Sequence, residues 1–172
     1  MKKLLYIAPH LSTGGLPQYL TKKIELLKDI FDIYVIEWND ITGGQLIVQK
    51  NKITNLIPPH KFYTLGENKL ELFDIIHKIK PDIIHLEEIP ENFMDDSVAR
   101  KLYSTDRDYF LVETSHDSSQ NPNNKFFFPD KFMFVSNWQV DQYINVDIPK
   151  ILVEYPIEYT PRPPRIDALK HI

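Results

Sequence analysis

Residues 2–29 read KKLLYIAPHLSTGGLPQYLTKKIELLKD and contain three local signals in succession. Leu4–Ala8 is a short apolar run of the kind that forms a buried strand in a parallel sheet. Gly14–Gly15 interrupts this run, and residues 16–27 then carry apolar side chains at helical spacing. Pro17 suits the first turn of a helix, where a residue without an N–H is tolerated. The stretch therefore predicts a strand, a glycine-rich turn and a helix, the opening unit of a doubly wound α/β sheet.

The glycine-rich turn is a candidate ligand-binding element. Two adjacent glycines allow a ligand to approach the backbone closely, and the N-terminus of the following helix offers free N–H groups and the positive end of a dipole. This arrangement favours a phosphate, or a sugar carried on one, and the candidate binding residues are Ser12, Thr13, Gly14 and Gly15. The turn matches neither GxGxxG nor the P-loop signature. A turn that needs glycine for its geometry alone therefore remains the alternative.

The composition limits the class of protein. A chain of 172 residues is long enough for one domain with a sizeable core. Its net charge of −4 argues against a nucleic-acid-binding surface. The absence of cysteine excludes disulfides and thiolate chemistry, and no apolar run approaches the roughly 20 residues of a membrane span. We expect a soluble cytoplasmic domain with no transmembrane segment, for which a peripheral membrane contact stays open.

The rest of the chain alternates between strand-like and helix-like segments. Short apolar runs predict strands at 31–38, 61–65, 83–86, 109–113, 131–135 and 151–155. Helical spacing and capping residues predict helices at 67–80, 95–104 and 136–144. Two further short strands are predicted at 45–49 and 52–57. The alternation favours an α/β fold with a doubly wound, mostly parallel, Rossmann-like sheet and helices on both faces, in a single domain over residues 1–155.

The proline-rich segment that follows predicts a linker. Pro156, Pro161, Pro163 and Pro164 give residues 156–172 the composition of a stiff, extended connector. The last residues, from Ile166, begin a helical pattern. We therefore expect residues 156–172 to be a linker and the start of a second domain that is missing from this chain or truncated.

Candidate binding residues are expected at one rim of the sheet, because open parallel sheets bind ligands beyond the carboxyl ends of their strands. Polar residues follow four of the predicted strands at this rim. They are Ser12, Thr13, Gly14, Gly15, Glu87, Glu88, Thr114, Ser115, His116, Asp117, Ser136 and Asn137.

Among these residues, His116 is the candidate catalytic residue. It follows a buried strand directly, where an imidazole can donate to a hydroxyl or act as a base, and an ordinary surface histidine is the alternative. Glu87 and Glu88 are predicted to be a hydroxyl-binding carboxylate beside a solvated one, or else two solvated acids. We expect His85 to pack inside its strand, and His10 either to point into the cleft or to satisfy the turn.

Several common catalytic signatures are absent from the sequence. The histidines lack the spacing of HExxH and related motifs, so no metal site is predicted. There is no GxSxG elbow, which removes the common α/β-hydrolase signature. No second carboxylate stands at a defined spacing for a glycosidase pair.

Five segments in order resemble the N-terminal domain of a GT-B-fold glycosyltransferase, most closely the retaining group called family 4. The first is the strand, glycine turn and helix of residues 2–29. The others are KPDIIHL (80–86), YFLVETSHD (109–117), DKFMFVSNW (130–138) and KILVEYPIE (150–158). The sequence departs from this family at residues 155–158, where YPIE replaces the usual Asn-Gly after the last strand.

The resemblance implies a two-domain enzyme that transfers a sugar from a nucleotide-sugar donor to a glycan, lipid or small-molecule acceptor. This half would bind mainly the acceptor, and the missing C-terminal domain would bind the donor. By position, Gly14–Gly15 would face the donor phosphates, His116 would lie near the transferred sugar, and Ser136 would begin a helix. The family works without a bound metal, and the nucleotide sugar is a co-substrate, so no cofactor is expected. The isolated chain should be unable to transfer sugar.

A second hypothesis comes from a different class of protein. The same α/β architecture would serve a non-catalytic module that binds a ligand or a partner protein at the same rim. A response-regulator-like switch is weaker, because the required acidic cluster at strand ends is absent. A dinucleotide oxidoreductase is also weaker, because Glu37 follows the first glycine without the rest of the fingerprint.

Overall fold

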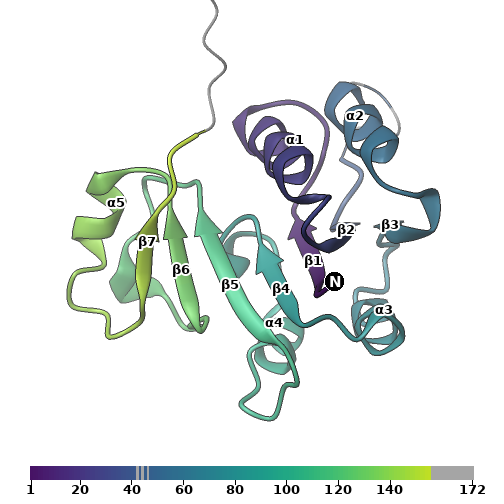
Figure 1. Cartoon of the computed structure of the whole chain (residues 1–172). Coiled ribbons are helices and arrows are strands. Elements are labelled where there is room, and N and C mark those ends of the chain that lie inside the picture. The colour runs from purple at the N-terminus through teal and green to yellow at the C-terminus, as the bar shows by residue number, and fades with distance from the viewer. Residues whose placement is uncertain (42, 44, 46, 156–172) are drawn as a thin grey trace, which may run out of the picture.

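The N-terminal strand β1 (Lys3–Ala8) lies inside a parallel sheet in a computed structural model that describes residues 1–41, 43, 45 and 47–155. Among these residues the sheet has seven strands in the order β3-β2-β1-β4-β5-β6-β7, and all neighbours are parallel (Figure 1). The other strands are β2 (Asp32–Glu37), β3 (Phe62–Thr64), β4 (Ile83–Leu86), β5 (Phe110–Ser115), β6 (Lys131–Phe134) and β7 (Lys150–Leu152). The predicted single Rossmann-like α/β fold is confirmed.

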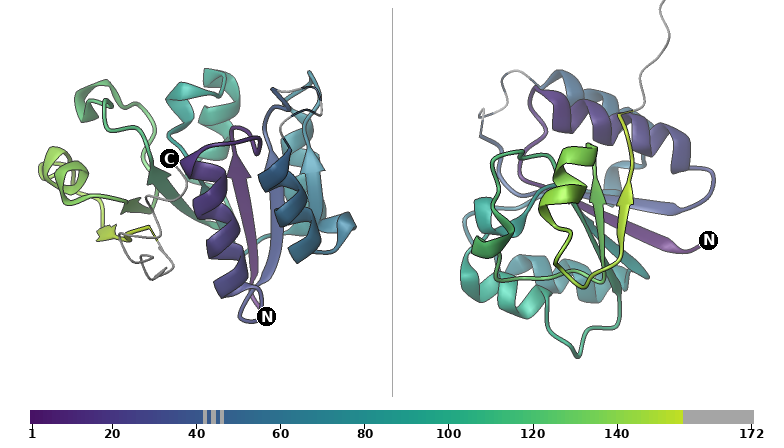
Figure 2. Two further views of the ribbon diagram at one scale, coloured as in Figure 1. Left: turned by 90° about the horizontal axis from the view of Figure 1, so that it is seen from above. Right: turned by 90° about the vertical axis from the view of Figure 1, so that its left-hand side faces the viewer.

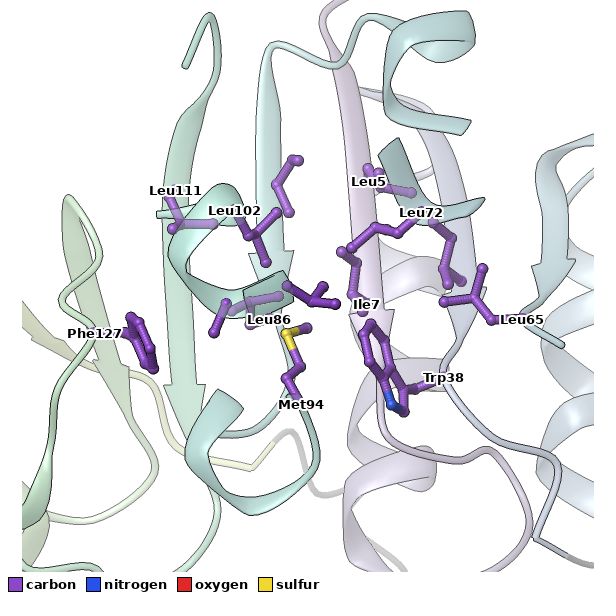
Figure 3. Close-up of a cluster of buried hydrophobic side chains, with 14 of the residues drawn as sticks. Leu5, Ile7, Trp38, Leu65, Leu72, Leu86, Met94, Leu102, Leu111 and Phe127 are labelled. Carbon is purple, nitrogen blue, oxygen red and sulfur yellow. The ribbon is translucent and has the colours of Figure 1, made fainter. Parts of the chain in front are cut away.

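Helices cover both faces of this sheet (Figure 2). They are α1 (Gly15–Leu27), α2 (Val48–Leu56), α3 (Glu71–Ile79), α4 (Asp96–Leu102) and α5 (Asn137–Gln142), with three short 3₁₀ turns at Pro59–Lys61, Pro90–Asn92 and Pro122–Asn124. One core cluster joins β1 and β2 to α1 and α2, and another joins the opposite face to α3 and α4. Figure 3 shows the second cluster, in which Leu72 of α3 and Leu102 of α4 lie over the sheet.

Both faces of β1 are buried, which explains its continuous apolar sequence. Leu4 and Tyr6 belong to the core beneath α1 and α2, whereas Leu5 and Ile7 belong to the core beneath α3 and α4. Successive side chains of a strand point to opposite faces, so a strand covered on both sides needs apolar residues throughout. The hydrophobic run therefore specifies a central strand.

The order of the strands reverses beside β1. The chain runs from β1 outward through β2 to β3, and then returns to place β4 on the other side of β1. The loops after β1 and β4 consequently lead away to opposite faces from the carboxyl ends of these two strands. This is the position at which open α/β sheets bind ligands.

The prediction of two short strands at 45–49 and 52–57 was wrong. The structure has the helix α2 (Val48–Leu56) there. Gln49, Ile53 and Ile57 are buried and recur every four residues, which is a helical period and not the period of two that a strand requires.

Other predicted boundaries shift by a few residues. Helix α3 begins at Glu71, α4 and α5 are shorter than predicted, and β7 ends at Leu152, before the predicted end at Tyr155. The predicted linker at 156–172 lies outside the described residues. Within the part of the chain that the structure describes, no helix is long and apolar enough to cross a membrane.

Candidate functional site

The loops after β1, β4, β5 and β7 meet at the carboxyl edge of the sheet. The residue at the centre is Glu87, which follows β4 directly and whose side chain is fully buried. Its backbone N–H donates to the carbonyl of Ile7 in β1 at 2.9 Å, so the parallel pairing of the two strands continues to the residue after β4. The alternative of two solvated acids at this position is therefore wrong for Glu87.

Lys23 of α1 pairs with this buried carboxylate. Its Nζ lies 2.5 Å from Oε1 of Glu87, and it also lies over the rings of Tyr6 and Tyr19 at 5.1 and 5.0 Å from their centroids. The aromatic faces and the carboxylate together compensate a buried ammonium group for its lost hydration. Helix α1 thus supplies a positive charge directly beside Glu87.

His116 lies between Glu87 and Tyr155. The imidazole Nε2 lies 3.3 Å from Oε2 of Glu87, and Nδ1 lies 2.8 Å from the hydroxyl of Tyr155. A carboxylate only accepts hydrogen bonds, so in the neutral ring the proton belongs on Nε2 and Nδ1 accepts from the Tyr155 hydroxyl. The ring packs edge-on against Tyr19 at a centroid distance of 5.2 Å. The outward-facing atom of the site is therefore a hydrogen-bond acceptor.

The charges explain the protonation states at this edge. Burial alone would raise the pKa of the Glu87 carboxyl, but the charge of Lys23 and hydrogen bonding to His116 outweigh it and hold that pKa well below its usual range. Burial, and then the charge of Lys23, lowers the pKa of His85 to about 3. His85 is therefore neutral and its Nε2 pairs with the Thr114 hydroxyl at 2.7 Å. The prediction that His85 is a packed histidine is confirmed.

Glu88 supports the loop that carries His116. Its Oε1 accepts the backbone N–H of Ile89 at 2.9 Å and that of His116 at 3.3 Å. Burial raises the pKa of the Glu88 carboxyl. The side chain therefore positions the backbone of His116, and Glu87 contacts the imidazole itself.

The glycine turn lies against the same site. Gly14 has a φ of 112°, a conformation that side-chain-bearing residues rarely adopt. A Cβ added at Gly15 would lie 3.5 Å from the Tyr155 hydroxyl, so this position closely faces Tyr155. Ser12 is buried and its hydroxyl pairs with Nδ1 of His10 at 2.9 Å, which is the turn-satisfying role considered for His10. Thr13 is exposed beside them.

Glu37 lies at the carboxyl end of β2, where dinucleotide-binding folds place an acid on the ribose hydroxyls. Here its carboxylate accepts the backbone N–H of Leu11 at 2.9 Å, the amine of Lys50 at 2.5 Å and the hydroxyl of Thr64 at 3.1 Å. These contacts fix the loop after β1. The acid is therefore engaged inside the domain and not presented to a ribose.

The remaining predicted residues lie further along the same edge. Asp117 accepts from the backbone N–H and the hydroxyl of Ser119 at 2.7 and 2.6 Å, and these hydrogen bonds lower the pKa of its carboxyl. Ser136 caps α5 by accepting the N–H of Gln139 at 3.3 Å. Asn137 is exposed at the first residue of α5. Within the described residues, no contact joins Ser136 or Asn137 to His116.

Sequence reasoning missed Lys23, Tyr19 and Tyr155. Lys23 follows Tyr19 by four residues on the buried side of α1, and a lysine in that position was the available signal. Tyr155 lies in the YPIE segment that departs from the family pattern. Lys23 contacts Glu87, and Tyr155 contacts His116. Each contact joins distant parts of the chain, and no local sequence pattern reveals it.

The described residues contain no group of three or more histidine and acidic side chains arranged to hold a metal ion. The groups at this edge are an imidazole acceptor, a buried carboxylate and exposed backbone at the glycine turn. Comparison with known proteins adds no assignment, since no protein-family model matches the chain and no curated protein is significantly similar to it.

Proposed function

We propose that this chain is the acceptor-side domain of a retaining glycosyltransferase of the GT-B architecture, in which a second domain binds the nucleotide-sugar donor. The observation that carries the proposal is the orientation of His116. Its side chain is only 7% exposed, its Nε2 is directed at the buried Glu87 carboxylate, and its Nδ1 is directed at the hydroxyl of Tyr155. A sugar hydroxyl is a suitable donor to that nitrogen.

Each residue at the edge has a role in this proposal. A sugar hydroxyl replaces the Tyr155 hydroxyl on Nδ1 of His116, and Glu87 keeps the ring in the required tautomer and orientation. Lys23 keeps Glu87 ionised. The glycine turn, which has no side chains, faces the donor phosphates across the cleft between the two domains. The nucleotide sugar is the only co-substrate that these residues require.

The engagement of Glu37 also supports a sugar-transfer site over a dinucleotide site. An acid that already accepts from Leu11, Lys50 and Thr64 would have to exchange these partners to bind a ribose. The glycine turn also lacks the dinucleotide fingerprint. A hydroxyl-binding site at His116 needs no such rearrangement of the loop after β1.

Ligand-observed NMR tests the proposal on the 172-residue chain. We expect saturation transfer to acceptor oligosaccharides, and we expect His116→Ala to weaken their binding by about tenfold, or about 1.4 kcal/mol. His60→Ala changes an exposed histidine outside the site and should leave binding unchanged. Oligosaccharide binding that survives His116→Ala would contradict the assignment of His116.

Release of free nucleotide from nucleotide sugars tests the reaction itself. We expect no release from the 172-residue chain, and release from a polypeptide that joins this chain to a donor-binding domain. Turnover by the isolated chain would contradict the proposed division between the domains. If neither polypeptide binds or turns over any nucleotide sugar, the non-catalytic binding module becomes the working function.

A further inference from the structure

A polar pocket of about 530 Å³ lies beside the candidate site. One wall is the loop after β5, with Ser119 and the 3₁₀ turn Pro122–Asn124, and the other wall is α5 with the residues that follow it. Figures 1 and 2 show α5 and this loop at the same end of the sheet. Of the side chains that line this pocket, the candidate site described above involves only Ser119, which donates to Asp117.

Side-chain amides and one indole provide most of the lining, from Gln120, Asn121, Asn123, Gln142, Asn145 and Trp138. No charged side chain lines the pocket among the residues that the structure describes. Each amide can donate and accept at once, as a sugar hydroxyl also does. An anionic ligand would find no cation in this lining, whereas an uncharged, hydroxyl-rich ligand would find matching groups.

Most of these amides are available to a ligand. Within the described part of the chain, the side chains of Gln120, Gln142 and Asn145 make no hydrogen bond, and neither does the amide of Asn123. Asn121 is the exception, because its Oδ1 accepts the backbone N–H of Asn123 at 2.9 Å and shapes the 3₁₀ turn. The pocket therefore combines one structural amide with several unpaired ones.

Trp138 provides an apolar surface at the same place. It is 52% exposed, whereas the other tryptophan of the chain, Trp38, is 2% exposed and lies in the core. An exposed indole offers a flat face on which the C–H face of a pyranose ring can pack. A Trp beside several amides therefore matches both the apolar and the polar sides of a sugar.

The two walls of the pocket are fixed to one another. The amide nitrogen of Gln139 in α5 donates to the carbonyls of Ser115 and Asp117 at 3.2 and 3.4 Å, and its Oε1 accepts from the Ser136 hydroxyl at 3.2 Å. The Ser119 hydroxyl donates to Asp117 at 2.6 Å. Asp117 directly follows His116, so the pocket is connected to the candidate site through the loop itself.

We propose that this pocket binds an uncharged saccharide, with a pyranose ring packed on Trp138 and its hydroxyls bonded to the surrounding amides. The assignment of this saccharide as the distal part of the acceptor rests on the proposed function. The binding of an uncharged saccharide does not rest on the proposed function, because it follows from the lining of the pocket alone. The pocket thereby selects a neutral, extended acceptor over a phosphorylated one.

Tryptophan fluorescence tests the inference, since only Trp138 is exposed to solvent. The wild-type chain is titrated with cellohexaose, maltohexaose and chitohexaose, with glucose 6-phosphate as the charged comparison. We expect at least one hexasaccharide to change the emission saturably and to protect Trp138 from acrylamide, while glucose 6-phosphate has no effect. Trp138→Phe removes the reporter, so its binding is measured by saturation-transfer NMR, where we expect weaker binding of the same saccharide.

Matched variants locate the binding. Gln142→Ala and Asn145→Ala should each weaken saccharide binding by about threefold to tenfold. Asn51→Ala, which changes an exposed amide on α2, should leave saccharide binding unchanged. Saturation-transfer NMR provides a second readout for any variant that alters the emission by itself. Equal binding by all variants, or no response to any of the three saccharides, would overturn the inference.

The outcomes also separate this inference from the proposed function. Saccharide binding at Trp138 without any nucleotide-sugar turnover in the two-domain polypeptide supports the pocket and rejects the transferase. Turnover that is insensitive to Trp138→Ala, together with no saccharide binding at Trp138, rejects the pocket and leaves the transferase intact.

Discussion

Lys23 and Lys125 are both buried beside glutamates, but only one of these clusters leads to the surface. Lys125 lies in the loop after β5, and its Nζ lies 2.8 Å from Oε1 of Glu113 and 3.2 Å from Oε2 of Glu91. The Tyr103 hydroxyl donates to Glu113 at 2.6 Å. Every one of these partners holds the loop against the sheet, so the Lys125 cluster is a structural one.

The Lys23 cluster differs from the Lys125 cluster in the second contact of its carboxylate, which belongs to Glu87. One oxygen of Glu87 meets Lys23, and the other meets His116, whose far nitrogen reaches Tyr155 near the surface. A buried lysine–glutamate pair is therefore no sign of a functional site by itself. The Lys23 pair differs in that its carboxylate also contacts the imidazole of His116.

The largest effect is expected from Lys125→Met. This change leaves Glu113 and Glu91 without their cation, and removal of one partner from a buried ion pair costs about 3–5 kcal/mol of unfolding free energy. Lys52→Met removes an exposed lysine of α2 and should stay within about 0.5 kcal/mol. Urea denaturation at pH 7 measures both. A loss of unfolding free energy below about 1 kcal/mol for Lys125→Met would contradict the structural role assigned to the Lys125 cluster.

The two glutamates should also differ in the pH dependence of stability. Burial, partly offset by Lys125, raises the pKa of Glu113 to about 7 from 4.5. The folded state then holds a proton that the unfolded state has lost, so the stability that Glu113 contributes is complete below pH 4.5 and is lost as the pH rises through 7. The stability of the wild type relative to Glu113→Gln should fall by about 2–3 kcal/mol between pH 5 and 8.

Glu87 provides the opposite case for the same experiment. Its pKa lies below 4.5 in the folded state, so its contribution is present above pH 4.5 and is lost only as the pH falls through that lower value. Glu87 itself should therefore contribute no slope of stability between pH 5 and 8, although Glu87→Gln also removes the partner of the buried Lys23, whose pKa burial already lowers. A slope between pH 5 and 8 that is the same in the wild type and in Glu113→Gln, measured by urea denaturation at each pH, would contradict the assigned protonation state of Glu113.

A smaller effect is expected when the cover over His116 is removed. Tyr155→Ala should expose Nδ1 and increase the rate of modification of His116 by diethyl pyrocarbonate about tenfold, equivalent to about 1.4 kcal/mol. Mass spectrometry of the peptides measures the rate, with the exposed His60 and His77 of the same sample as internal references. An unchanged rate at His116 would show that Tyr155 does not cover it in solution.

The smallest effect is expected from Tyr155→Phe. The ring stays but the hydroxyl that donates to His116 is lost, so unfolding free energy should fall by about 0.5–1 kcal/mol. The modification rate of His116 should rise less than in Tyr155→Ala. Tyr63→Phe, at a partly exposed tyrosine of β3, should have little effect on either measurement. If His116 in Tyr155→Phe is modified as fast as in Tyr155→Ala, the hydrogen bond alone, and not the ring, protects His116.

Local patterns predicted the fold better than the site. The apolar run of β1 and the glycine turn were sufficient for the opening unit, because each signal acts within a few residues. Placement of His116 after a strand was likewise predictable. At α2 the prediction was wrong because the helical spacing of Gln49 and Ile53 was read as two strands.

The partners of His116 were beyond such patterns for a physical reason. Glu87 acquires its ionised state from Lys23, which is 64 residues away in the chain, and Tyr155 reaches His116 from 39 residues away. Burial, charge and orientation at this edge exist only once the sheet has formed. Residue types alone indicated a polar rim, and only the packed structure showed which of its residues act together.

The position of β1 also affects how the chain is made. β1 is synthesised before both of its neighbours β2 and β4, so its second edge stays unpaired until Ile83–Leu86 exist. At about 5–20 residues per second, that interval is roughly 4–16 s. During synthesis the most apolar strand of the nascent chain is therefore open to another chain, and a chaperone that binds residues 3–8 would have its greatest effect in this interval.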